Sequence, residues 1–166
     1  MPEYNVLATG SKEFQLLADG QVLGHLHYPE WFSLKAVITL PDGSSFPIEP
    51  RGFWGTTIEL KSEQQVLLTF KMHWDGKIIL KSKLDGSRAL VFKNKSVLKG
   101  TYELQDKDKQ ELLLVQPNFQ WRQLNHNYTI TTTELLEEFR AKELLLLTTV
   151  HCANYYMTMV AAAAAM

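Results

Sequence analysis

Lysine residues at alternate positions are the feature of this sequence with the clearest chemical meaning. They occur in Lys81-Ser-Lys83 and again in Lys93-Asn-Lys95. Side chains two positions apart on a strand point to the same face, so each pair could direct two ammonium groups at one phosphate. The segment 71–99 has eight basic and two acidic residues, a net charge of +6, whereas the whole chain carries -1. Adjacent hairpins that gathered these side chains would create a local basic field suited to phosphate headgroups.

Six residues of this segment are therefore candidate ligand-binding residues. They are Lys77, Lys81, Lys83, Arg88, Lys93 and Lys95. The expected partner is an anionic phospholipid headgroup or another phosphorylated ligand. Alternatively, the lysines only keep the outer face of an antiparallel sheet soluble. The near-neutral net charge gives no general attraction to nucleic acid, so no nucleic-acid partner is expected.

Histidine and acidic residues provide weaker candidates for a metal site. His25-Leu-His27 places two imidazoles on one strand face, and His73 or His126 could complete a site. The wet face of a strand explains this spacing equally well. The loop 106–111 resembles part of a calcium loop, but it lacks the glycine and the spacing that such loops need. We therefore expect a solvated hairpin loop there, and neither a metal nor a cofactor.

The sequence contains no recognisable catalytic motif. The serine-hydrolase elbow, the zinc-protease helix, the paired Cys-x-x-Cys and both common phosphate-binding glycine loops are missing. A non-enzymatic protein is expected, with His151 as a hydrogen-bonded core histidine. Large aromatic residues near strand ends are expected to close the mouths of a barrel or to line a ligand cleft. These aromatic residues are Trp31, Trp54, Trp74 and Trp121.

Length and cysteine content favour a single domain over residues 1–166 in a reducing compartment. Cys152 is the only cysteine, so no disulfide can form within the chain. The N-terminal stretch has no basic region followed by an apolar one, as a secretory signal would. We expect a cytoplasmic protein, with peripheral membrane contact through the basic segment. The sequence does not predict the oligomeric state.

Most of the chain reads as strands separated by turns. Asp-Gly, which suits tight hairpins, occurs at residues 19, 42, 75 and 85. About twelve strands are predicted, at 13–18, 21–28, 32–40, 46–49, 53–61, 66–72, 77–83, 88–93, 97–105, 111–116, 118–124 and 127–132. The connections are too short for crossover helices, so the strands should form an antiparallel meander.

The C-terminal segment predicts one long helix over about 134–162. Thr131-Thr-Thr-Glu134 suits a helix start, and no full charge follows Glu143. A helix that is apolar all round needs apolar surroundings all round, which could be a bilayer around a tail anchor, an oligomer interface or the protein itself. Polar residues such as Asn154 disfavour lipid because hydrocarbon supplies no hydrogen bonds. A twelve-stranded barrel is wide enough to need a filled interior, and the helix could fill it.

This order of elements resembles the tubby C-terminal-like fold, which tubby proteins, phospholipid scramblases and plant LURP-one-related proteins share. The residues that carry the resemblance are Arg51-Gly-Phe-Trp-Gly-Thr-Thr-Ile-Glu-Leu60, Lys99-Gly-Thr-Tyr-Glu-Leu104, Asn118-Phe-Gln-Trp121 and the helix from Leu144 to Tyr156. The resemblance implies a barrel threaded by its C-terminal helix. Tubby proteins bind phosphoinositides through Lys and Arg at alternate strand positions, a spacing that Lys81-Ser-Lys83 shares.

The expected fold is thus mainly β, a closed antiparallel barrel of about twelve strands around a central hydrophobic C-terminal helix. The expected role is non-enzymatic binding of anionic lipid, phosphoinositide or another phosphorylated ligand. The alternatives are a tail-anchored membrane protein with a cytosolic β domain and a protein-interaction scaffold.

Overall fold

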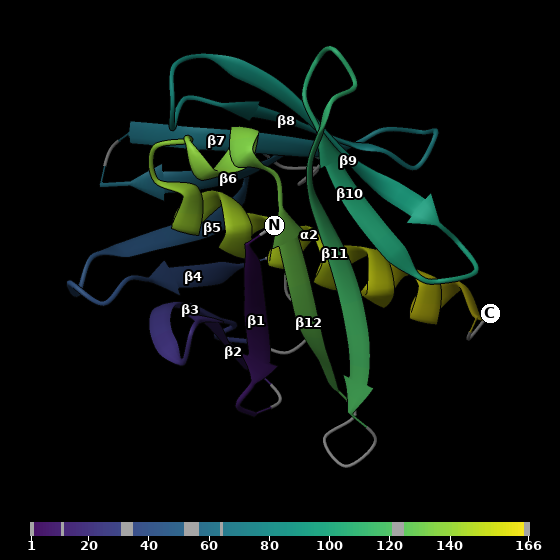
Figure 1. Ribbon diagram of the computed structural model, residues 1–166, viewed down its shortest axis with the longest axis horizontal. Coiled ribbons are helices and arrows are strands. Elements are labelled where there is room, and N and C mark those ends of the chain that lie inside the picture. The colour runs from purple at the N-terminus through teal and green to yellow at the C-terminus, as the bar shows by residue number, and fades with distance from the viewer. Residues whose placement is uncertain are drawn as a thin grey trace.

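The computed structural model describes residues 2–10, 12–30, 35–51, 57–63, 65–120 and 125–164. Within these residues, twelve strands form one closed antiparallel barrel around a C-terminal helix, which confirms the predicted fold class (Figure 1). The strands are β1 (Glu3–Ala8), β2 (Glu13–Ala18), β3 (Gln21–His27), β4 (Ala36–Thr39), β5 (Ser45–Arg51), β6 (Thr57–Ser62), β7 (Gln65–Met72), β8 (Ile78–Ser82), β9 (Arg88–Ser96), β10 (Thr101–Gln105), β11 (Glu111–Gln120) and β12 (Asn125–Thr132).

The strands follow the chain in a meander, and the barrel closes where β1 pairs with β12. Alternation of buried and exposed side chains gives each strand an inner and an outer face. In β1, Tyr4, Val6 and Ala8 are buried and the residues between them are exposed. In β8, Ile78 and Leu80 are buried in the same way. The inner faces together form the wall of one apolar core.

Closure by β1 was missed by the sequence prediction, which placed the first strand at 13–18. The stretch Glu3–Ala8 does alternate, but no turn residues mark its start, and its first partner is β12. Tyr4 lies opposite Ile130 and Val6 opposite Tyr128. The strand therefore depends on a pairing between the two ends of the barrel sequence.

The total of twelve strands was correct, but two predicted strands are largely one and several boundaries were wrong, including the end of β9, which continues to Ser96. The predicted strands 111–116 and 118–124 are largely one strand, β11, which continues through Pro117. Beyond Val115, β11 pairs only with β12 among the described residues, and a proline is tolerated where one side of a strand is open. The predicted strand 97–105 begins too early, because residues 97–100 form a turn. Parts of the predicted strands 32–40, 53–61 and 118–124 lie outside the described residues.

The predicted helix 134–162 is two helices, α1 (Glu134–Glu137) and α2 (Lys142–Ala164). Between them, Ala141 has a φ of 54°, in the left-handed region that ends a helix. The prediction was wrong at this point because helix-forming residues continue through the break. The interruption lets the chain turn from the end of β12 into the barrel.

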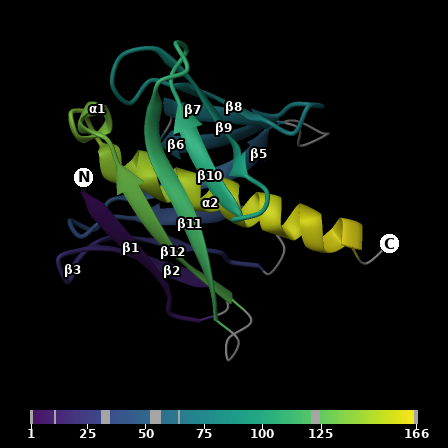
Figure 2. The same ribbon diagram turned by 45° about the vertical axis from the view of Figure 1, so that its right-hand side comes forward.

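The core of the barrel is occupied by α2. All ten residues from Leu144 to Ala153 are buried, so every face of this part of the helix is covered. Figures 1 and 2 show α2 passing between β11 and β12 on one side and the strands from β3 to β7 on the other. Enclosure by the barrel accounts for the uniformly apolar sequence of the helix.

Gly24 on β3 makes room for a side chain of the helix. A Cβ atom at Gly24 would lie 2.8 Å from Leu147 Cδ1 and 3.3 Å from the Thr39 carbonyl oxygen. Since real side chains do not approach so closely, the position requires glycine for space.

Among the described residues, no helix is long and apolar enough to cross a membrane.

Candidate functional site: a basic groove on the outer wall

The six candidate residues lie on or beside two neighbouring strands. Lys77 directly precedes β8, Lys81 lies within it and Lys83 directly follows it, whereas Arg88, Lys93 and Lys95 lie on β9. All are exposed except Lys93, which is partly buried. The meander therefore places these six side chains on adjacent parts of the outer wall.

Four of the six residues are paired with carboxylates. The pairs are Lys77 with Asp75 (3.8 Å), Arg88 with Asp85 (3.3 Å), Lys93 with Glu103 (3.8 Å) and Lys95 with Glu111 (2.6 Å). Glu103 and Glu111 come from β10 and β11, outside the basic segment. The register of β9 with β10 places Lys93 directly opposite Glu103. Acidic residues from neighbouring strands thus offset much of the positive charge that is concentrated in the segment 71–99.

The Lys93–Lys95 pair is directed at acidic residues of the protein itself. A hydrogen bond to Glu111 raises the pKa of Lys95. Burial, together with the nearby charge of Glu111, raises the pKa of Glu103. Both lysines therefore belong to a local network of charges, and this pair offers little free charge to an external phosphate.

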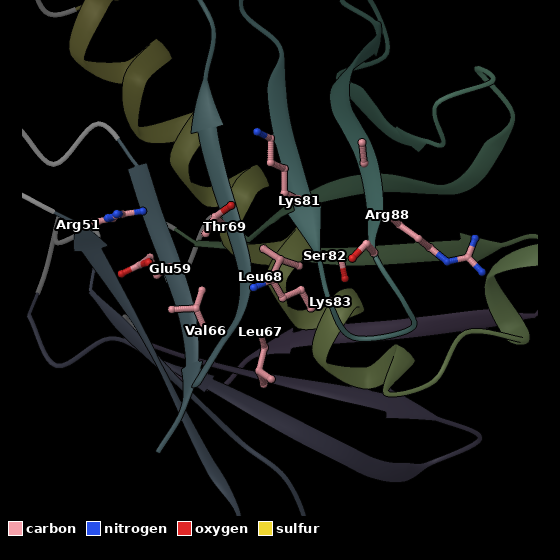
Figure 3. A pocket seen from close by; sticks show the side chains of 12 residues that line it. Arg51, Glu59, Val66, Leu67, Leu68, Thr69, Lys81, Ser82, Lys83 and Arg88 are labelled. Atoms are coloured by element: carbon pink, nitrogen blue, oxygen red, sulfur yellow. The ribbon is translucent and has the colours of Figure 1, made fainter. Parts of the chain in front are cut away.

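Lys81 and Lys83 line a groove of about 750 Å³ on the outer wall (Figure 3). Arg51, at the end of β5, also lines it. Within the described part of the chain, Arg51, Lys81 and Lys83 form no ion pair. The full lining is Arg51, Glu59, Val66, Leu67, Leu68, Thr69, Lys81, Ser82, Lys83, Ser87, Arg88 and Ala89.

The hollow arises from the side chains that flank Lys81 across the sheet. Thr69 of β7 lies opposite Lys81 on one side, and Ala89 of β9 lies opposite it on the other. Because both residues are short, the lysine stands between two depressions in the wall. Glu59, opposite Thr69 on the next strand, lies 3.8 Å from Lys61 and is largely buried.

Arg88 contributes to the rim of the groove but its charge is directed elsewhere. Figure 3 shows its side chain pointing away from Lys81 and Lys83. Its guanidinium lies 4.4 Å from the centre of the Phe139 ring and 3.3 Å from Asp85. The cations available to a ligand in the groove are therefore those of Arg51, Lys81 and Lys83.

Sequence reasoning missed Arg51 and the groove itself. Arg51 is 30 residues before Lys81 and joins it only because β5, β6, β7 and β8 are consecutive in the barrel. The groove could have been predicted from the hairpin register, which places the short residues Thr69 and Ala89 beside Lys81. Alternate lysines alone do not distinguish Lys81 and Lys83 from Lys93 and Lys95.

The metal candidates do not assemble into a site. His25 Nδ1 lies 3.3 Å from Glu13 Oε1, and His27 is exposed. No group of three or more metal-ligating side chains occurs among the described residues. The loop 106–111 is the predicted hairpin connection, in which Asp106 Oδ1 accepts hydrogen bonds from the backbone of Asp108 and Gln110 at 2.8 and 2.9 Å.

Trp74 neither closes the barrel nor lines a cleft, because it is exposed in the β7–β8 turn. The expectation for Trp74 was therefore wrong. Trp31, Trp54 and Trp121 lie outside the described residues.

A buried polar network anchors α2 to the wall. The Tyr28 hydroxyl and His151 Nδ1 are 2.7 Å apart, and Asn154 Nδ2 donates to the same hydroxyl at 3.0 Å. Tyr128 donates to Asn154 Oδ1. These contacts confirm the expectation that His151 is a hydrogen-bonded core histidine, and they give the Asn154 side chain partners on the barrel wall. Burial raises the pKa of Tyr28, Tyr128 and Cys152, so these groups stay protonated within the core.

Comparison with known proteins names no relative. No protein-family model, no curated protein and no solved structure matches the chain.

Proposed function

We propose that the protein is a non-enzymatic binding protein that holds a phosphate-bearing ligand in the groove of Arg51, Lys81 and Lys83. The observation that carries this proposal is the contrast within the basic segment. Most of its candidate cations are paired with carboxylates, whereas Lys81 and Lys83 remain unpaired within the described residues and share a groove with Arg51. Unpaired cations around a depression favour an external anion.

The chemistry of the lining suits a phosphate monoester. Arg51 offers a planar fork for two phosphate oxygens, and the lysines offer compact charges that adapt to position. The Thr69 hydroxyl can donate a further hydrogen bond. A groove of about 750 Å³ is within the size range of small-molecule sites. Leu67 and Val66 at its side provide an apolar surface for the carbon skeleton of a ligand.

Two sources could supply such a phosphate, a lipid headgroup or a free phosphorylated metabolite. The likeness to tubby proteins, in barrel architecture and in the Lys81-Ser-Lys83 spacing, favours a phosphoinositide headgroup at the cytoplasmic face of a membrane. Membership of the tubby-like superfamily is part of this proposal.

Titration calorimetry with inositol trisphosphate tests the free form of the ligand, and vesicles that contain a phosphoinositide test the lipid form. The Lys81→Gln/Lys83→Gln variant should bind at least tenfold more weakly than the wild type. The control is Lys107→Gln/Lys109→Gln, which changes the net charge equally but lies in the β10–β11 loop. Salt should weaken binding, because the screening length falls from about 10 Å at 0.1 M to about 3 Å at 1 M.

Equal losses in the two variants would indicate a diffuse charge effect and no groove site. Failure of both ligand forms to bind at low salt would remove the proposal and leave the interaction scaffold as the better description. Binding of the free ligand together with equal vesicle binding in the presence and absence of phosphoinositide would assign the groove to a soluble metabolite.

A further inference from the structure

Three apolar side chains stand in solvent at one end of the barrel. Five large hydrophobic residues are exposed in the described part of the chain, and three of them, Trp74, Val97 and Leu98, are 97%, 84% and 101% exposed. The other two reach only 40% and 45%. Single exposed apolar residues are common, but these three share a location. The β7–β8 and β9–β10 turns that hold them lie at the same end of the antiparallel meander (Figure 1).

Both turns hold their apolar side chains on an ordered backbone. In the first, His73 N donates to Lys77 O at 2.7 Å and Gly76 N donates to His73 O at 3.0 Å. The Tyr156 hydroxyl on α2 also donates to the Gly76 carbonyl. In the second, Gly100 N donates to Val97 O at 3.3 Å. Binding through these turns would therefore cost little backbone entropy.

Lysines surround the exposed apolar groups. Lys71 and Lys77 flank Trp74, while Lys95 and Lys99 flank Val97 and Leu98. The segments 71–77 and 95–99 together contain one acidic residue, Asp75. Lys71 and Lys99 form no ion pair within the described residues. The two hairpins are two strands apart along the barrel, or about 10 Å at the usual strand spacing.

We propose that this end of the barrel docks on an anionic lipid bilayer, with Trp74, Val97 and Leu98 entering the headgroup region and Lys71 and Lys99 contacting lipid phosphates. Tryptophan prefers the membrane interface, and basic residues near it are attracted to anionic lipids. A bilayer suits apolar groups that project from two separate turns, because it needs no matching pocket. The surface shares no residue with the groove, so the inference does not depend on the proposed ligand.

The test uses vesicles of phosphatidylcholine with and without phosphatidylserine, and no phosphoinositide. Leu98→Ser should weaken binding to the anionic vesicles at least tenfold. Leu135→Ser, the same substitution on α1 at the opposite end, should leave binding unchanged. Brominated lipids should quench tryptophan emission of the wild type, and Trp74→Phe should lower that quenching. Both turn positions are exposed, and thermal melts would verify that the variants fold.

Equal vesicle binding by wild type and Leu98→Ser, or equal quenching of wild type and Trp74→Phe, would overturn the docking proposal. So would a concentration-dependent dimer that Leu98→Ser abolishes, if the wild type bound no vesicles, because the partner would then be a second copy of the chain. The Lys81→Gln/Lys83→Gln variant separates the two proposals. This variant should lose binding to inositol trisphosphate and should still bind phosphatidylserine vesicles. The groove proposal and the docking proposal can therefore each fail without the other.

Discussion

The hydroxyl group of Tyr4 on β1 donates a hydrogen bond to the carboxylate of Glu137 on α1, 2.8 Å away. Thr132 at the end of β12 and Lys142 at the start of α2 donate to the same carboxylate, each at 2.9 Å. The Glu137 side chain therefore links the two closing strands of the barrel to the start of the central helix through hydrogen bonds.

Stability should depend on the ionisation of Glu137. Burial acts to raise the pKa of this carboxyl, but hydrogen bonds from Lys142, Tyr4 and Thr132 outweigh it and lower the pKa from its usual value of 4.5. A lowered pKa in the folded state stabilises the protein above the unfolded pKa, and this stabilisation is lost as pH falls through the folded value. Urea unfolding at a series of pH values should therefore show a decline below about pH 4.5 that Glu137→Gln makes shallower. Parallel curves for the two proteins would contradict this role.

The contact of Gly24 with Leu147 predicts a coupling between wall and helix. Gly24→Ala places a methyl group 2.8 Å from Leu147 Cδ1 and should destabilise the protein by about 1–3 kcal/mol, a typical cost of overpacking. Leu147→Ala should also destabilise it, by leaving a cavity. The double variant should be less destabilised than the sum of the two single variants, because the new methyl group enters the vacated space. Chemical denaturation of all four proteins measures the coupling, and strict additivity would argue against the contact.

The Asn154 side chain should contribute more to the stability of the fold than its size suggests. Asn154→Ala would leave the Tyr128 hydroxyl without its Asn154 acceptor and remove one partner of Tyr28. An unsatisfied buried polar group costs about 1–3 kcal/mol, which thermal or urea unfolding would detect. Adding Tyr128→Phe removes the hydroxyl that lost its Asn154 acceptor, so the double variant should lose less stability than the two single variants combined. A neutral Asn154→Ala would show that the network contributes nothing to stability.

Cys152 should be unreactive in the native state. Its side chain is fully buried on α2, and burial raises the pKa of the thiol, which suppresses the reactive thiolate. A thiol reagent should label it only as fast as the protein opens, and fully in denaturant. A Val97→Cys/Cys152→Ser variant, with its thiol in an exposed turn, provides the fast-reacting comparison. Rapid labelling of native wild-type protein would contradict the enclosed position of the helix.

Features that depend on residues close together in the sequence could be predicted from the sequence alone. Asp75-Gly76 marks a hairpin because Gly76 adopts a φ of 88°, which glycine accepts without strain. The buried and exposed sides of β8 follow from strand periodicity. The need of α2 for apolar surroundings follows from its composition, because a helix without a polar face cannot be stable against water. These inferences need no knowledge of which strands pair.

Features that depend on pairing between distant segments were decided only by the tertiary structure. β1 joins the barrel by pairing with β12 as well as with β2, and Pro117 is accepted because β11 has one strand neighbour at that position among the described residues. Lys93 and Lys95 are paired with Glu103 and Glu111, while Lys81, between Thr69 and Ala89, forms no ion pair within the described residues. Local sequence sets which face a side chain occupies, but strand register sets what lies opposite it, and that partner determines whether a lysine is available to a ligand.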